Sequence, residues 1–274
     1  IECMSLLDKA SLVITPNGYS ENTIYSVIPS SGAGDLSFTR ATDAWRTNSQ
    51  GLVQRTPWNL IRGSNQFDSI SLWTNALTVS VPNSGIAPNG SNTAYIFKST
   101  NNTNVQSIYQ LYTANASGNF STSFYVKKKE VNIIQLEFFP SPYSAEFGVN
   151  IDLTTNAYIN WASGVDSCIV ENVGTDGWKR VTITKNIPAT TSMYVQLFLA
   201  STINGVPREI CTLPVGSGIY LWGAQLVEGS SALEYFPTTD RQNVPRIDYS
   251  LGGCPTLLME PQRTNISIWS ENMA

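Results

Sequence analysis

The sequence contains no histidine. Nucleophilic catalysis of the Ser-His-Asp or Cys-His type requires an imidazole base, so these enzyme mechanisms are excluded. Zinc sites with histidine ligands and the two-histidine iron site are excluded for the same reason.

Charge is also scarce. Charged residues make up 13% of the chain, against a usual share of roughly 25%, and the formal net charge is −4. The longest run of positive residues is Lys127–Lys129, which is better explained as a solvated turn between two strands than as a binding patch. This composition argues against nucleic acid as a partner.

Long apolar runs and a leader pattern are missing. No stretch of about 18 apolar residues is present, so we expect no membrane span. Residues 1–9 lack the charged-then-apolar pattern of a signal peptide. If the protein works outside a cell, we expect it to leave by lysis or by a dedicated route.

Cysteine is sparse and scattered. The four cysteines have no CxxC spacing, so the chain is not a disulfide framework, and we expect mostly buried, reduced thiols. A four-cysteine zinc site stays open on paper, although such ligands usually come in close pairs. The four residues are Cys3, Cys168, Cys211 and Cys254.

Small polar and aromatic residues are abundant instead. The chain has 24 Asn, 31 Ser and 26 Thr, and aromatic residues reach 11%. Segments rich in β-branched and aromatic residues recur every ~10–15 residues between turn residues, without intervening helical periods. The pattern predicts an all-β fold, an antiparallel β-sandwich or jelly roll. The clearest predicted strands are 121–126, 132–139, 146–153, 179–184, 193–199 and 218–227.

The pattern divides the chain into three parts. Residues 1–56 are broken into short extended pieces that cannot bury a good core alone, so we expect an extended N-terminal anchoring segment. Residues 57–237 form the predicted sandwich, and residues 238–274 form an inter-module linker that leads into a next module. One short helix is predicted near residues 65–72.

An internal repeat supports this division. The segment from Leu52 to Phe67 reappears from Leu258 to Met273 without a gap, and Arg46-Thr47-Asn48 is echoed by Arg246-Ile247-Asp248. Chance similarity between polar strands is the alternative. We interpret the repeat as one linker type before and after a sandwich, and expect the chain to be part of a longer protein.

Three stretches carry a resemblance to a known family. Residues 5–16 with 25–29 and 36–42, and residues 235–249 continuing through 254–265, resemble anchoring and inter-module segments of bacteriophage fibre proteins, on head or tail, from phages of gut Bacteroidales and their relatives. Residues 177–181 with 218–226 resemble the closing strands of carbohydrate-binding-module-like jelly rolls.

The resemblance implies a structural protein of the virion without a cofactor. It implies a homotrimer or another symmetric oligomer, bound to phage capsid or tail proteins and in contact with host-surface glycans. The family's receptor site usually lies in a distal tip, and none follows in this sequence, so direct receptor binding by this chain stays open.

Sugar binding needs aromatic faces beside polar side chains. The candidates are Trp73, Tyr143 and Trp161, each next to a polar or turn stretch; for each, packing in the core or between subunits is the alternative. Trp178 and Trp222 lie inside strand patterns and are predicted to be core. Jelly rolls of this kind often hold one calcium ion, for which Asp68 and Glu228 are candidate ligands.

An enzyme is the least supported function. A glycosidase needs two carboxylates about 5–10 Å apart, and nothing pairs the acids near predicted hairpin ends. These acids, Asp152, Asp166, Glu171 and Asp176, are better explained by turn capping and solvation. The leading hypothesis is a phage fibre or decoration subunit, located in the virion, that attaches to the particle and presents the sandwich as a spacer or as a glycan adhesin for host-surface attachment. The alternative is a free carbohydrate-binding module of a polysaccharide-degrading system.

Overall fold

The structure is a computed structural model that describes residues 9–20, 22–39, 44–56, 59–141, 146–239 and 245–259. The chain divides into two compact units. The first combines residues Ile1–Thr56 with Val244–Ala274, and the second is Pro57–Asn243. Among the described residues, no helix has the length and apolar character needed to cross a membrane.

The first unit contains a three-stranded antiparallel sheet of β1 (Val13–Ser20), β2 (Thr23–Ile28) and β3 (Leu36–Ser37), in the order β1-β2-β3. Asp35 fixes the connection between β2 and β3, because its Oδ1 accepts hydrogen bonds from the Ser26 backbone amide at 2.8 Å and hydroxyl at 3.0 Å. Only Ile24 of this sheet is fully buried among the described hydrophobic side chains. The sheet therefore has little core of its own.

Two hairpins in this unit contain the shorter echo, Arg46-Thr47-Asn48 and Arg246-Ile247-Asp248, whereas residues 260–273 of the longer repeat lie outside the described residues. The first pairs β4 (Trp45–Thr47) with β5 (Val53–Arg55), and the second pairs β18 (Ile247–Asp248) with β19 (Thr256–Leu257). Both begin their turns in the same way. Asn48 Oδ1 accepts the amide of Gln50 at 2.9 Å, and Asp248 Oδ2 accepts the amide of Ser250 at 3.0 Å.

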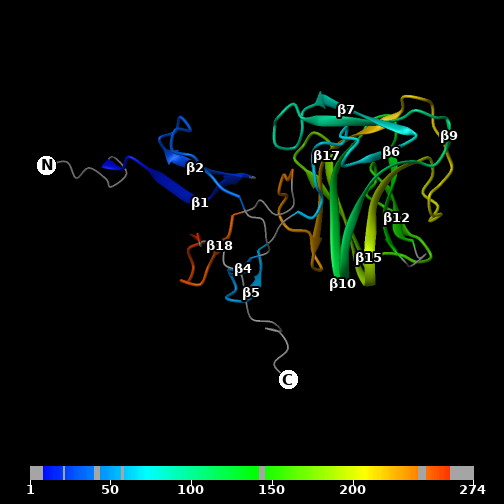
Figure 1. Cartoon of the computed structure of the whole chain (residues 1–274). Coiled ribbons are helices and arrows are strands. Elements are labelled where there is room, and N and C mark those ends of the chain that lie inside the picture. Colours follow the sequence, from blue (N-terminus) through cyan, green and yellow to red (C-terminus); the bar gives the residue numbers. More distant parts are fainter. Residues whose placement is uncertain are drawn as a thin grey trace, which may run out of the picture. The chain divides into compact units, whose positions relative to one another are not determined.

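The second unit is all strands and turns. Two strands of 23 residues dominate it, β10 and β15, which run antiparallel beside each other (Figure 1). The strands are β6 (Thr74–Ala76), β7 (Thr78–Gly85), β8 (Ala94–Ser99), β9 (Thr103–Asn104), β10 (Gln106–Lys128), β11 (Ile133–Ser141), β12 (Phe147–Asp152), β13 (Tyr158–Asn160), β14 (Ser167–Val173), β15 (Trp178–Ala200), β16 (Cys211–Thr212) and β17 (Gly218–Glu228).

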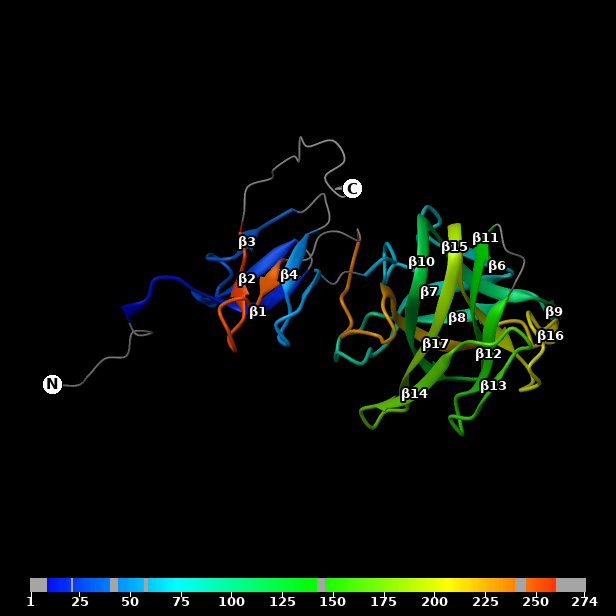
Figure 2. The ribbon, with the colours of Figure 1, turned by 90° about the horizontal axis from the view of Figure 1, so that it is seen from below.

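The two long strands belong to both layers of the sandwich. The first half of β10 and the second half of β15 lie in one layer, ordered β6-β10-β15-β11-β12-β13, which we call the β11 sheet. The other halves lie in the layer ordered β14-β15-β10-β17-β8-β7, the β17 sheet. Register shifts near Ala116 and Gly118 mark the passage of β10 between layers, as expected for strands that switch sheets. Figure 2 shows β11 beside β15.

The core lies where alternating side chains of the two sheets face inward. These side chains are close to fully buried, and each contributes roughly 1.5–3 kcal/mol by leaving water. The largest on the long strands and their neighbours are Ile108, Phe120, Phe124, Ile134, Leu136 and Phe138. The predicted antiparallel sandwich is thus confirmed.

The structure also bears on the predicted short helix and on the predicted state of the cysteines. The prediction of a short helix near residues 65–72 is wrong. The segment forms successive turns, in which the Ser69 amide donates a hydrogen bond to the Gln66 carbonyl and the Leu72 amide donates one to the Ser69 carbonyl. Cys168 and Cys211 are buried free thiols, as expected, and burial raises their pKa values to about 12 and about 11. Cys254 is a free thiol but exposed.

Candidate functional site

The outer face of the β11 sheet carries the candidate site. Side chains of directly paired residues share a face. Tyr194 of β15 pairs with Leu111 of β10 on one side and with Phe139 of β11 on the other. Two residues along β15, Gln196 pairs with Tyr109. The register therefore gathers aromatic and amide side chains from three neighbouring strands.

Three rings form a row across these strands, which we call the aromatic row: Tyr109, Tyr194 and Phe139. The ring centroids of Tyr109 and Tyr194 lie 5.7 Å apart with an edge-on geometry of 79°. Those of Phe139 and Tyr194 lie 6.1 Å apart, tilted by 35°. All three side chains are partly exposed, and Leu111 beside them is 45% exposed. The row is apolar surface that is open to solvent.

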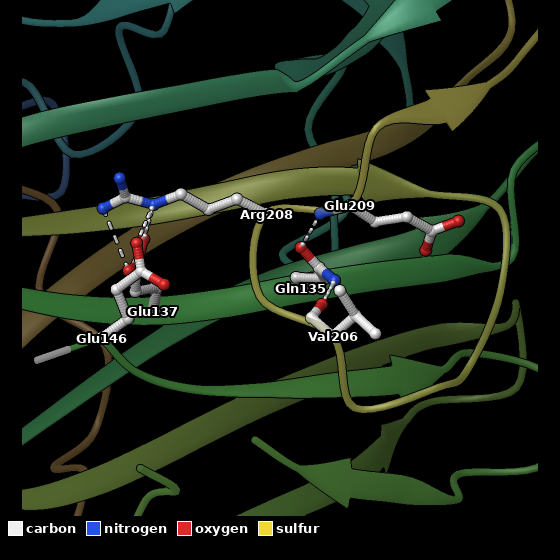
Figure 3. A network of polar contacts seen from close by, with 6 residues as sticks. All are labelled: Gln135, Glu137, Glu146, Val206, Arg208 and Glu209. Carbon is white, nitrogen blue, oxygen red and sulfur yellow. Dashed lines mark hydrogen bonds and ion pairs between the residues drawn. The ribbon is translucent and has the colours of Figure 1, made fainter. Parts of the chain in front are cut away.

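A buried acid adjoins the aromatic row. Glu137 of β11 is fully buried, and Arg208 reaches over it from the connection between β15 and β16. The Arg208 guanidinium donates from Nη2 to Glu137 Oε1 at 3.1 Å and from Nε to Oε2 at 3.3 Å. Its Nε also lies 3.1 Å from Glu146 Oε1. Figure 3 shows both carboxylates gathered on one side of the guanidinium.

Arg208 also joins the aromatic row. Its guanidinium carbon lies 4.5 Å from the centroid of the Phe139 ring, within the range of a cation–π contact. One face of Phe139 is therefore covered by the cation, whereas no such cation–π contact is found at Tyr109 or Tyr194 among the described residues. The two tyrosines are the rings that this face offers to a ligand.

The segment that carries Arg208 is fastened to the sheet by amides. Gln135 of β11 donates from Nε2 to the Val206 carbonyl at 2.7 Å, and its Oε1 accepts the Glu209 amide at 3.2 Å (Figure 3). Asn150 of β12 donates to the Thr202 carbonyl at 3.2 Å. Gln135 and Asn150 are both fully buried. These hydrogen bonds position Arg208 through neutral amide side chains, so they add no buried charge to that of Glu137.

Burial is the largest influence on the pKa of Glu137. Removal from water raises the pKa of Glu137 to about 7 from an ordinary 4.5, although Arg208 acts in the opposite direction. A fully buried carboxyl cannot reach a substrate from solvent, so Glu137 and Glu146 do not form the open carboxylate pair that glycoside hydrolysis uses. The arrangement is built to hold Arg208 in place.

Two of the sequence-predicted sugar residues are buried. Trp73 is 1% exposed, donates its indole N–H to the Gly63 carbonyl at 2.9 Å and packs near Phe67. Trp161 is 3% exposed and donates to Asn150 Oδ1 at 2.6 Å. Neither ring face is open for stacking: Trp73 is packed in the core, the alternative considered from the sequence, and Trp161 is buried on the outer face of the β11 sheet. Tyr143 lies outside the described residues.

Trp161 nevertheless supports the site. A Cβ atom placed on Gly148 would lie 2.5 Å from the Trp161 ring, so the indole packs directly on the glycine backbone. Gly148 pairs with Glu137 in the register of β11 and β12. The indole thus lies on the outer face beside the buried acid and helps to exclude water from it.

The proposed calcium ligands are far apart. Asp68 Oδ1 accepts a hydrogen bond from the Tyr95 hydroxyl at 2.8 Å, and Tyr95 pairs with Leu221 of β17. Glu228 stands seven residues farther along the same strand, where it pairs with Phe120. The two acids therefore do not share a site. Among the described residues, no group of three or more His, Cys, Asp or Glu side chains is arranged for a metal.

The opposite sheet has a second aromatic cluster, but loops cover it. Trp178 and Trp222 are 3% and 7% exposed, which confirms their prediction as core residues. Their indole N–H groups donate to the Ile86 carbonyl and the Thr93 hydroxyl, each at 3.1 Å. Partners in one loop, between β7 and β8, satisfy both donors. This cluster is better explained by packing than by ligand binding.

The acids near hairpin ends behave as turn residues. Asp152 Oδ1 accepts the Thr154 amide at 2.7 Å. Burial acts to raise its pKa, but hydrogen bonds from Thr154, Thr155 and Asn132 outweigh it, and the pKa is lowered. Asp176 forms an ion pair with Lys127 at 2.6 Å. The predicted turn and surface roles of these two acids are confirmed.

The sequence did not single out the aromatic row. Tyr109, Phe139 and Tyr194 lie inside or next to strand patterns, where an aromatic residue is normally taken as core. The only available signal was alternation: Phe139 and Tyr194 occupy positions out of phase with the apolar residues Phe138 and Val195, which are fully buried. Arg208 had no signal, because it lies in an irregular connection.

Comparison with known proteins adds little. No family model and no curated protein matches the chain. One similar solved structure is the enzymatically active domain of tailspike protein 4 of bacteriophage CBA120, with 15% identity and a TM-score of 0.38 over 61% of this chain. The match spans about a fifth (21%) of that tailspike chain.

A second similar structure is the carbohydrate-binding module TmCBM61 in complex with β-1,4-galactotriose. It has 13% identity and a TM-score of 0.36, and the match covers 62% of this chain and 99% of that module. Similarities this distant carry no functional inference. The function proposed below is therefore based on the residues of this chain alone.

Proposed function

We propose that the protein is an attachment subunit whose β-sandwich binds carbohydrate. The observation that carries the proposal is the aromatic row on the open face of the β11 sheet, next to the Arg208 network. Sugars bind proteins through ring stacking together with polar side chains held in fixed positions. Here Gln135, from within the sheet, supplies that fixation.

We further propose that the subunit belongs to a bacteriophage fibre, on head or tail. The support comes from the sequence: residues 5–16 and 235–249 resemble anchoring and inter-module segments of such fibres. The first unit, with few buried side chains of its own, suits a segment that is stabilised by other subunits. On this proposal the protein resides in the virion, forms a homo-oligomer and has no catalytic activity.

The full chain tests the carbohydrate part directly. Purified protein applied to an array of bacterial surface polysaccharides and plant and animal oligosaccharides is expected to bind at least one glycan class reproducibly. Binding should be competed by the soluble form of the same glycan. Absence of binding to every class, by a protein that is folded by circular dichroism, would contradict the proposal.

A further inference from the structure

We propose that the aromatic row binds an uncharged oligosaccharide, with Tyr109 and Tyr194 as the stacking rings and Arg208 as a hydrogen-bond donor to sugar hydroxyls. This inference rests on the proposed carbohydrate-binding function and specifies its site and ligand class.

The shape of the face suits a chain of sugar rings. Tyr109, Tyr194 and Phe139 come from three adjacent strands, so the row runs across the strands, which lie about 4.8 Å apart. A ligand that lies along the row meets a new ring at each strand. Because Arg208 covers one face of Phe139, that residue forms a wall. The two tyrosines, whose ring planes are inclined by 79°, form a stepped platform on which each ring stacks on a different sugar.

Hydrogen-bonding groups next to the platform remain available. Among the described residues, neither Arg208 Nη1 nor the Gln196 carboxamide has a hydrogen-bond partner. In Figure 3 the guanidinium nitrogen without a dashed line points away from Glu137 and Glu146. Gln196 lies between Tyr109 and Glu137 in register and is 8% exposed. These groups fit sugar hydroxyls, which both donate and accept.

Charge selects the class of sugar. Arg208 faces two carboxylates, Glu137 and Glu146, at 3.1 Å each, so its positive charge is already compensated. A uronate or sulfate group would have to compete with these carboxylates and would be repelled by the exposed one, Glu146. An uncharged glycan neither competes with these carboxylates for Arg208 nor is repelled by Glu146. The network therefore disfavours acidic polysaccharides.

Ring removal tests the site. Isothermal titration of the full chain would use hexasaccharides of glucose, galactose and mannose, with hexagalacturonate as the acidic probe. Tyr194→Ala and Tyr109→Ala are each expected to weaken binding of the neutral ligand by about tenfold or more, because each removes one of the two stacking rings. Tyr194→Phe keeps the ring and should retain most of the affinity.

The matched control is Tyr158→Ala. Tyr158 is a tyrosine of the same sandwich, 47% exposed on β13, outside the aromatic row, so its removal should leave binding unchanged. Each variant is first checked for a native circular dichroism spectrum and melt. If Tyr194→Ala does not fold, Tyr109→Ala and Tyr194→Phe still decide the outcome.

Charge is tested with Glu146→Gln. This substitution frees part of Arg208 and is expected to raise the affinity for hexagalacturonate at least severalfold relative to the unmodified chain. Hexagalacturonate binding to the unmodified chain as tightly as neutral sugars would overturn the inference. Neutral binding that survives both tyrosine substitutions would also overturn it but leave the proposed function standing. Failure of all glycans to bind would reject both.

Discussion

At the scale of single residues, the unusual feature is a carboxyl group with no exposure to solvent. Glu137 occupies a position where a buried strand residue would normally be apolar, and among the described residues Arg208 is the cation that compensates it. Burying a charge costs free energy even when a partner is present. The protein tolerates this unfavourable free energy of burial at the face that carries the candidate site, as expected of a functional position.

Glu137 should make the stability of the sandwich depend on pH. Its pKa is about 7 in the folded chain against an ordinary 4.5, so the folded state holds the proton more tightly than the unfolded state. The free energy of unfolding should therefore fall as pH rises from about 4.5 to about 7, by up to about 3 kcal/mol from this group. Urea unfolding at pH 5 and pH 8 measures it.

The comparison for this prediction is Glu137→Gln, which cannot ionise. The difference in unfolding free energy between the natural chain and Glu137→Gln should change between pH 5 and pH 8 in favour of the variant. Parallel pH curves for the two proteins would show that Glu137 is not the group responsible.

Gly148 is required by the indole packed against it. An added methyl group at this position would lie 2.5 Å from the Trp161 ring, and displacing a buried ring costs typically 1–3 kcal/mol. We expect Gly148→Ala to lower the free energy of unfolding by about this amount, measured by urea unfolding followed by tryptophan fluorescence. Gly253→Ala, where a Cβ meets nothing within 4 Å, should have no comparable effect.

At the scale of elements, most strands were predictable and the long ones were not. The apolar alternation at 121–126 and 193–199 correctly indicated strands, but each covers only about a third of a 23-residue element or less. The intervening residues are polar and include Gly118 and Pro188, so they look like turns. Two such segments, paired at Asn119 and Asn186, stay extended because each supplies the other's backbone partners.

The candidate site was hidden from the sequence for a related reason. Tyr109, Phe139 and Tyr194 are separated by at least 30 positions along the chain, and only the register of β10, β15 and β11 brings them together. Tryptophans beside polar stretches were the natural candidates, yet the side chains of Trp73 and Trp161 are both buried. Composition reveals that aromatic residues are abundant, while pairing decides which of them are open.

Asp248 helps to join the two hairpins of the first unit, together with the Arg46 guanidinium, which donates to the Ile247 carbonyl, and the Tyr249 amide, which donates to the Thr47 carbonyl. Asp248 Oδ1 accepts the Thr47 amide of the other hairpin at 2.6 Å while Oδ2 holds its own turn at Ser250. Hydrogen bonds from Ser250 and Thr47 lower the pKa of Asp248 to about 2, so it stays ionised at all ordinary pH values. Its stabilising contribution is lost only as pH falls from about 3.9 toward 2.

Without this acceptor, the contact between the two hairpins should open more often. In Asp248→Ala, we expect faster hydrogen exchange at the amides of Thr47 and Ser250, measured at neutral pH by NMR or mass spectrometry. Asp248→Asn retains an oxygen acceptor and should preserve most of the protection. Unchanged exchange at Thr47 in Asp248→Ala would mean that the hairpins associate without this bond.

At the scale of the whole molecule, two units of different character share one chain. The sandwich has a large buried core of its own, whereas the unit made of 1–56 and 244–274 has few buried hydrophobic side chains among its described residues. A domain that buries enough apolar surface folds alone. We expect a fragment of residues 57–243 to give a β-type circular dichroism spectrum and one cooperative melt. A helical or non-cooperative result would contradict this.

The first unit needs another source of stability, and symmetric self-association is the one that the fibre proposal predicts. Its exposed apolar residues include Val27, Trp45 and Val53, at 50%, 54% and 72% exposure. A closed oligomer would bury such side chains at repeated contacts. Light scattering at micromolar concentration should therefore give a trimer or another closed oligomer for the full chain and a monomer for fragment 57–243. A monomeric full chain would remove the main physical reason for a fibre subunit and favour a free carbohydrate-binding module, because a free module needs no partner to bind its glycan.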